Sequence, residues 1–179
     1  MATATIFALT FIDGLVIAGL VINGWGAFAA CFYAYTNNLL PMTHIIFWSF
    51  TGVFLAEQIS YALCFYYGDR IMSFGRMLCT KIYHIRMKRH WGPLLPSVSP
   101  VLWDNAEIYV TANVQQWGGL YLLLGRWTPV ASLVPAFCAI CKMPYLTFIK
   151  YSAAACFLWA SIWNSVVYAV AIGYLNISI

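Results

Sequence analysis

The sequence predicts an all-α integral membrane protein, in which two re-entrant helical hairpins and two transmembrane helices form an inverted-topology repeat around an amphipathic, basic middle segment. Of the 179 residues, 63% are hydrophobic and 8% are charged, whereas ordinary soluble domains are about 45–50% apolar and about 25% charged. Two apolar runs have the length of one membrane crossing, and two others are interrupted by turn-forming residues. We expect a single membrane domain over residues 1–179.

The first apolar run, residues 5–35, is too long for one ordinary membrane crossing and too short for two. Asn23-Gly24-Trp25-Gly26 lies in its middle, and these residues are typical of a chain reversal. We therefore expect the first re-entrant hairpin over 5–35, with Asp13 in its first half.

Two further runs fit single transmembrane helices. About 20 helical residues cross a hydrocarbon core that is roughly 30 Å thick. Residues 43–67 meet this length with one carboxylate, Glu57. The second transmembrane helix is expected over 148–175, because residues 151–175 carry no formal charge.

The segment 68–116 contains most of the positive charge. Because Lys and Arg beside membrane spans resist translocation, we expect a cytoplasmic basic loop over 68–96. These basic side chains can also attract anionic lipid headgroups, but fixing the orientation is the simpler role. Aromatic and polar residues up to 116 favour a helix in the membrane interface. The basic residues of this cluster are Arg70, Arg76, Lys81, Arg86, Lys88 and Arg89, and Asp69 is the acidic residue beside them.

The run 117–142 predicts the second re-entrant hairpin. Arg126 lies inside it, and Pro129 and Pro135 remove backbone donors that a continuous helix needs. This hairpin enters from the cytoplasm and the first one from outside, which gives the two halves opposite orientations. Because broken backbone at membrane depth must be covered by protein or water, we expect the hairpins to face a shared interior.

Three ionisable residues at membrane depth are candidates for a functional site: Asp13, Glu57 and Arg126. Each costs about 2.5–3.5 kcal/mol to insert and is a functional hypothesis by default. A guanidinium can bind a lipid phosphate through two hydrogen bonds, and opposed hairpins would let Arg126 pair with Asp13, which is the structural alternative. Glu57 is either a proton carrier, since desolvation favours a neutral carboxyl group, or a partner for freed backbone groups.

Residues 117–159 also carry a pattern that resembles the DedA family of small membrane proteins, also called the VTT or SNARE-associated domain. Upstream, the Phe54–Tyr61 stretch looks like the family's G-D-Q-x-x-Y segment, and Phe11-Ile12-Asp13 looks like its F-L-E. The specific part of the pattern consists of Gly118, Gly125-Arg126-Trp127-Thr128-Pro129, Pro135, Met143-Pro144-Tyr145, Phe148, Tyr151 and Trp159.

The resemblance implies two facing re-entrant hairpins and a proton-coupled flippase or scramblase, which moves phospholipid or undecaprenyl phosphate between leaflets of the bacterial cytoplasmic (inner) membrane. Arg126, Pro129 and Ser132 match the substrate-binding stretch, with Ser132 where the family has a second arginine. Asp13 matches the first acid of the charge relay, to which we add Glu57; no acid lies near Trp25, where the second is expected. These departures favour the alternative, a non-transporting structural subunit or scaffold of a larger membrane complex.

No other chemistry is indicated. Cys138 and Cys141 form a C-x-x-C, for which close packing is favoured over thiol–disulfide exchange because our topology places the pair near the reducing side. The three histidines lack zinc-ligand spacing. We expect no enzyme activity, metal, cofactor or nucleic-acid partner. The expected partners are membrane lipids with anionic headgroups, and a homo-oligomer or a larger membrane complex.

Overall fold

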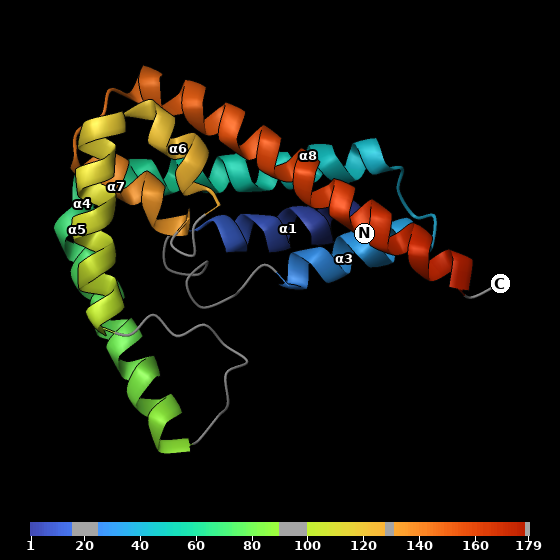
Figure 1. Ribbon diagram of the computed structural model, residues 1–179, viewed down its shortest axis with the longest axis horizontal. Coiled ribbons are helices and arrows are strands. Elements are labelled where there is room, and N and C mark those ends of the chain that lie inside the picture. The colour runs from blue at the N-terminus through green and yellow to red at the C-terminus, as the bar shows by residue number, and fades with distance from the viewer. Residues whose placement is uncertain (16–24, 90–99, 128–130, 178–179) are drawn as a thin grey trace.

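The computed structural model describes residues 1–15, 25–89, 100–127 and 131–177, and these residues contain helices and no strand (Figure 1). The all-α prediction is confirmed for this part of the chain. In order, the elements are α1 (Ala2–Gly14), α3 (Trp25–Thr36), α4 (Met42–Arg89), α5 (Pro100–Trp117), α6 (Gly119–Gly125), the short 3-10 helix η1 (Ala131–Leu133), α7 (Val134–Ile140) and α8 (Tyr145–Ile177).

Two described helical stretches are long and apolar enough to cross a membrane, Met42–Ile71 of α4 and Tyr145–Tyr174 of α8, each with 30 residues. Only 44% and 33% of their most apolar windows are buried. A soluble protein rarely exposes an apolar surface of this extent, whereas a bilayer solvates it. The two exposed apolar stretches therefore indicate a membrane protein. Exposed apolar side chains on α8 include Phe157, Leu158, Ile162, Val166 and Val170.

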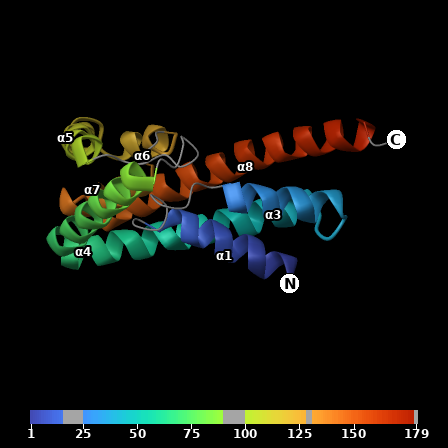
Figure 2. The ribbon, with the colours of Figure 1, turned by 90° about the horizontal axis from the view of Figure 1, so that it is seen from below.

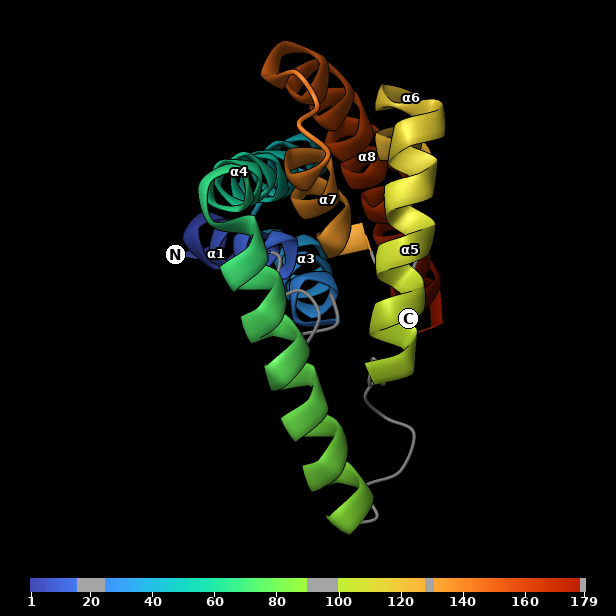
Figure 3. The ribbon, with the colours of Figure 1, turned by 90° about the vertical axis from the view of Figure 1, so that its left-hand side faces the viewer.

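Helix α4 bends at Tyr67, whose backbone angles (φ −125°, ψ 19°) are not helical. Beyond this kink α4 turns away from the bundle and continues to Arg89 (Figures 1 and 3). We predicted a basic loop over 68–96, so the helical conformation of residues 68–89 is a correction. Its physical reason is that Arg, Lys, Met and Leu are good helix formers, and the first proline after the kink is Pro93.

The four short helices of the two predicted hairpins pack in a repeating pattern. Helix α1 lies on α4 and its neighbour α3 lies on α8 (Figure 2). In the second half of the chain, α6 lies on α8 and α7 lies on α4. In each half, the first arm thus contacts the long helix of its own half and the second arm contacts the long helix of the other half. The two halves therefore interlock around a common interior.

The interior has two apolar clusters with polar side chains between them. One cluster surrounds α7 and includes Phe137 and Phe148, while the other joins α1, α3, α4 and α8 and includes Ile6 and Ile45. Along α4 and α8, buried polar residues lie between these clusters. They are Ser49, Glu57 and Ser60 on α4 and Ser152 and Asn164 on α8.

Helices α1 and α4 approach each other closely at two glycines. A Cβ atom on Gly52 would lie 2.3 Å from Oγ1 of Thr10 and 2.8 Å from the carbonyl oxygen of Phe7. A Cβ atom on Gly14 would lie 2.8 Å from Cβ of Ala56. Because one of these obstacles is backbone, the helices can adjust only by separating.

We expect Gly52→Ala to lower the free energy of unfolding by about 1–3 kcal/mol, since it overpacks this contact. Gly173→Ala on α8 is the matched control, because a Cβ there has no neighbour within 4 Å and alanine favours a helix by about 1 kcal/mol over glycine. Unfolding in mixed micelles measures both. Equal stabilities of the two variants would contradict the close α1–α4 contact.

Candidate functional site

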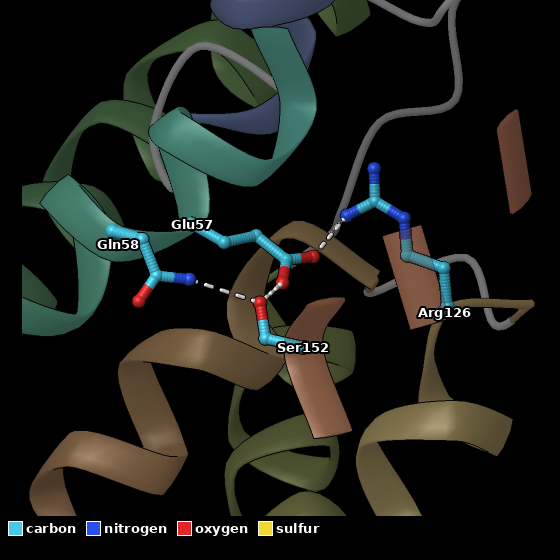
Figure 4. Close-up of polar contacts among 4 residues, drawn as sticks. All are labelled: Glu57, Gln58, Arg126 and Ser152. Atoms are coloured by element: carbon cyan, nitrogen blue, oxygen red, sulfur yellow. Dashed lines mark hydrogen bonds and ion pairs between the residues drawn. The ribbon is translucent and has the colours of Figure 1, made fainter. Parts of the chain in front are cut away.

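The centre of the candidate site is a buried ion pair between Glu57 and Arg126. Nη1 of Arg126 donates to Oε1 of Glu57 at 2.5 Å, and the two side chains are 6% and 3% exposed, respectively (Figure 4). Glu57 comes from α4, and Arg126 directly follows the last residue of α6. A buried charge is costly unless it is paired and hydrogen-bonded. The pair therefore joins the first half of the chain to the second.

Two further polar side chains extend the pair toward α8. Ser152, which is fully buried on α8, donates from Oγ to Oε2 of Glu57 at 2.6 Å. Gln58 donates from Nε2 to Oγ of Ser152 at 3.1 Å (Figure 4). We call Gln58, Ser152, Glu57 and Arg126 the polar network. It fixes both carboxylate oxygens of Glu57 and joins α4, α8 and the end of α6.

Arg126 has two features that its ion pair does not account for. Its guanidinium carbon lies 5.0 Å from the ring centre of Trp159, which is a cation–π geometry. Its Nε is buried and has no hydrogen-bond partner among the described residues. Most buried polar atoms in proteins have a partner, so this donor is available to a ligand or a water molecule.

Glycines set the position of Arg126. A Cβ atom on Gly119 would lie 2.1 Å from the ring of Tyr151, so α6 rests directly on α8. A Cβ atom on Gly125 would lie 2.9 Å from Cγ2 of Val134, at the start of α7. These two approaches place the end of α6 between α7 and α8, where the arginine that follows points at Glu57.

The ion pair differs from the pairing that the sequence predicted. We expected Asp13 opposite Arg126, but Glu57 provides the carboxylate partner of Arg126 in the described structure. Asp13 is partly exposed near the end of α1, beside Gly14, which packs on Ala56 of α4. The reason is that α6 rests on α8 and Glu57 projects from α4 toward Ser152 of α8. The end of α6 therefore meets Glu57.

Two further predicted site residues are Ser132 and Pro129. Ser132 is buried in η1. Pro129 lies outside the described residues, as does the middle of the first hairpin, residues 16–24. Ser152 and Gln58 were not predicted from the sequence as members of the site. A polar residue on the buried face of each long helix was the signal that could have found them.

The cysteines lie mostly inside the bundle. Cys138 is fully buried in the apolar cluster around α7, and Cys156 lies next to Glu57 and Ser152. Cys31, Cys64, Cys138, Cys141 and Cys156 are free thiols. Among the described residues, His, Cys, Asp and Glu side chains form no group of three that could hold a metal ion.

Comparison of this chain with protein-family models, with curated proteins and with solved structures gave no match.

Proposed function

We propose that this protein is a DedA-like transporter that moves an anionic, phosphate-bearing lipid between the two leaflets of a membrane. The observation that carries the proposal is the buried guanidinium of Arg126, whose Nε has no partner in the described structure. A phosphate is a preferred ligand of arginine, because its oxygens accept two parallel hydrogen bonds from the guanidinium.

In this proposal, the ion pair opens when Arg126 binds the lipid phosphate and forms again when the phosphate is released. Without lipid, Glu57 neutralises the charge of Arg126. A lipid phosphate that enters the interior competes with Glu57 for the guanidinium. Glu57 then takes up a proton, because an unpaired carboxylate in an apolar interior is costly, and Ser152 and Gln58 hold the neutral group in place. Loss of the proton restores the pair and releases the phosphate to the other leaflet.

The proposal includes the membrane topology. We place α1 and α3, and likewise α6 and α7, as two re-entrant hairpins of an inverted-topology repeat, with Asp13 in the first hairpin as a second relay group. The interlocking contacts support this arrangement, because each hairpin touches both long helices. Transporters of this architecture bind substrate near the middle of the bilayer, between the repeats.

The proposal also includes the location. We place the protein in the bacterial cytoplasmic membrane as a multi-pass protein, with the basic end of α4 on the cytoplasmic side. The support is the positive-inside rule, applied to Arg70, Arg76 and Lys81 just beyond the kink.

A structural subunit of a larger membrane complex is the second candidate. One observation favours it: both carboxylate oxygens of Glu57 are occupied, by Arg126 and by Ser152. A fully bonded pair can lock the two halves together without moving a lipid.

Leaflet exchange in proteoliposomes separates the two candidates. We expect the purified protein to move fluorescent phosphatidylglycerol between leaflets faster than protein-free liposomes, and to move phosphatidylcholine of the same chain length more slowly, since its quaternary ammonium opposes Arg126. Exchange at the protein-free rate for both lipids would overturn the transport proposal and leave the structural subunit.

A further inference from the structure

An aromatic groove lies between α4 and the turn that joins α7 to α8, apart from the ion pair. It has a volume of about 450 Å³, which is within the range of small-molecule sites. Its lining residues include Gln58, Tyr61, Phe65, Tyr66, Lys142 and Tyr145. On α4 the groove extends from Gln58 to Tyr66, which is about 12 Å at 1.5 Å per residue. The groove therefore has room for a lipid headgroup.

One cation lies at the outer part of this groove. Nζ of Lys142 is 4.4 Å from the ring centre of Phe65 and 3.4 Å from the Phe65 carbonyl oxygen. The backbone of Lys142 is left-handed (φ +57°), a conformation that glycine adopts at lower cost at a helix C-terminus. The backbone conformation alone would favour glycine here. A lysine at this position therefore indicates that its exposed ammonium group has a binding role.

Gln58 lines the groove and carries an unpartnered acceptor. Its Oε1 is buried and lacks a hydrogen-bond partner among the described residues, while Nε2 of the same side chain donates to Ser152. The groove thus reaches the polar network, and a ligand that donates a hydrogen bond to Oε1 would be linked through Ser152 to Glu57.

The position of the groove identifies its occupant as a lipid. It lies at the end of one membrane-spanning stretch, which ends at Ile71, and at the beginning of the other, which starts at Tyr145. Residues Tyr66 and Tyr145 are 77% and 48% exposed, and tyrosines concentrate at membrane–water interfaces. Basic residues follow just beyond, at Arg70 and Arg76.

We infer that the aromatic groove is a binding site for an anionic phospholipid whose headgroup carries a hydrogen-bond donor, such as glycerol. Lys142 binds the phosphate, and Oε1 of Gln58 accepts a hydrogen bond from the headgroup hydroxyl. This inference rests on the proposed function, for which it supplies the access site and the substrate class. It predicts a preference for phosphatidylglycerol over phosphatidylmethanol, which has the same charge but no headgroup hydroxyl.

Photocrosslinking tests the site without requiring transport. Benzoylphenylalanine replaces Tyr66 in the groove or, as the control, Tyr33 on α3, which is also exposed. The full-length protein is placed in phosphatidylcholine vesicles that contain either phosphatidylglycerol or phosphatidylmethanol, and crosslinked lipid is measured by mass spectrometry. We expect about fivefold more phosphatidylglycerol than phosphatidylmethanol at position 66 and no preference at position 33.

Two variants assign the contacts. Lys142→Gly should reduce crosslinking of both anionic lipids by about fivefold while the unfolding midpoint stays equal or rises, because glycine suits the left-handed backbone. Gln58→Met should remove the preference for phosphatidylglycerol and leave the phosphatidylmethanol signal unchanged. Unchanged crosslinking in a folded Lys142→Gly variant would overturn the site.

The outcomes also separate this inference from the proposed function. Selective crosslinking at position 66 without leaflet exchange supports the binding site and overturns transport. Leaflet exchange without selective crosslinking overturns the binding site alone.

Discussion

Glu57→Ala is expected to lower the free energy of unfolding by about 3–5 kcal/mol. The variant leaves the guanidinium of Arg126 buried without a carboxylate partner, and an uncompensated buried charge costs about this much. It also frees Oγ of Ser152, which donates to Glu57 in the wild type. Reversible unfolding in mixed micelles measures the effect.

Three further variants distinguish the effect of the lost charge on stability from the effect of lost packing. Ser152→Ala removes the hydrogen bond to the charged Glu57 and the one that Ser152 accepts from Gln58. It leaves the ion pair in place and should cost less, about 1.5–3 kcal/mol. Asp69→Asn, at an exposed carboxylate, should change stability by no more than about 0.5 kcal/mol. The double variant Glu57→Met with Arg126→Met removes both charges and should regain most of the wild-type stability. A double variant as unstable as Glu57→Ala would contradict a stabilising role of the pairing.

Arg126→Ala is expected to reduce phosphatidylglycerol exchange by about a hundredfold, to near the protein-free rate. The variant removes the donors that we propose for the phosphate, and two charge-assisted hydrogen bonds are worth at least this factor. Arg126→Lys keeps the charge but loses the planar pair of donors, so its exchange should fall less, by about tenfold. Leaflet exchange is measured in proteoliposomes with equal amounts of inserted protein.

The matched control is Lys150→Gln, because Lys150 is an exposed cation near the start of α8. Its exchange should equal that of the wild type. If Lys150→Gln and Arg126→Ala reduced exchange equally, the effect would come from total charge rather than from the buried guanidinium.

The proton-carrier role of Glu57 is tested separately by Glu57→Gln. If the pH dependence of lipid exchange were the same in this variant as in the wild type, Glu57 would not carry the proton.

Hydrophobic composition and run length were sufficient to predict the long helices. Residues 43–67 and 148–175 both fall within helices whose apolar stretches have the length of a membrane crossing. Asn23-Gly24 and Pro129, on which the prediction of two interrupted runs rested, lie outside the described residues, so the hairpin turns stay a prediction. Residue Arg126 was found as a candidate because a charge in an apolar run is costly wherever it lies.

The carboxylate partner of Arg126 could not be predicted from local sequence patterns. Whether Asp13 or Glu57 meets the guanidinium depends on how α6 rests on α8, and that contact is made by Gly119 against Tyr151. The Ser152 contact likewise joins residues 95 positions apart in the chain. The helix over 68–89 was missed for a different reason: clustered positive charge was read as a loop, although the residues themselves favour a helix.

The most direct measurement is phosphatidylglycerol exchange by the double variant Glu57→Met with Arg126→Met. This variant fills the same space with apolar side chains but lacks both charges of the pair. It therefore distinguishes an arginine that binds lipid from an ion pair that only stabilises the fold. We predict normal insertion and unfolding with exchange at the protein-free rate. Exchange near the wild-type rate in the folded double variant would contradict the role of the buried ion pair in lipid transport.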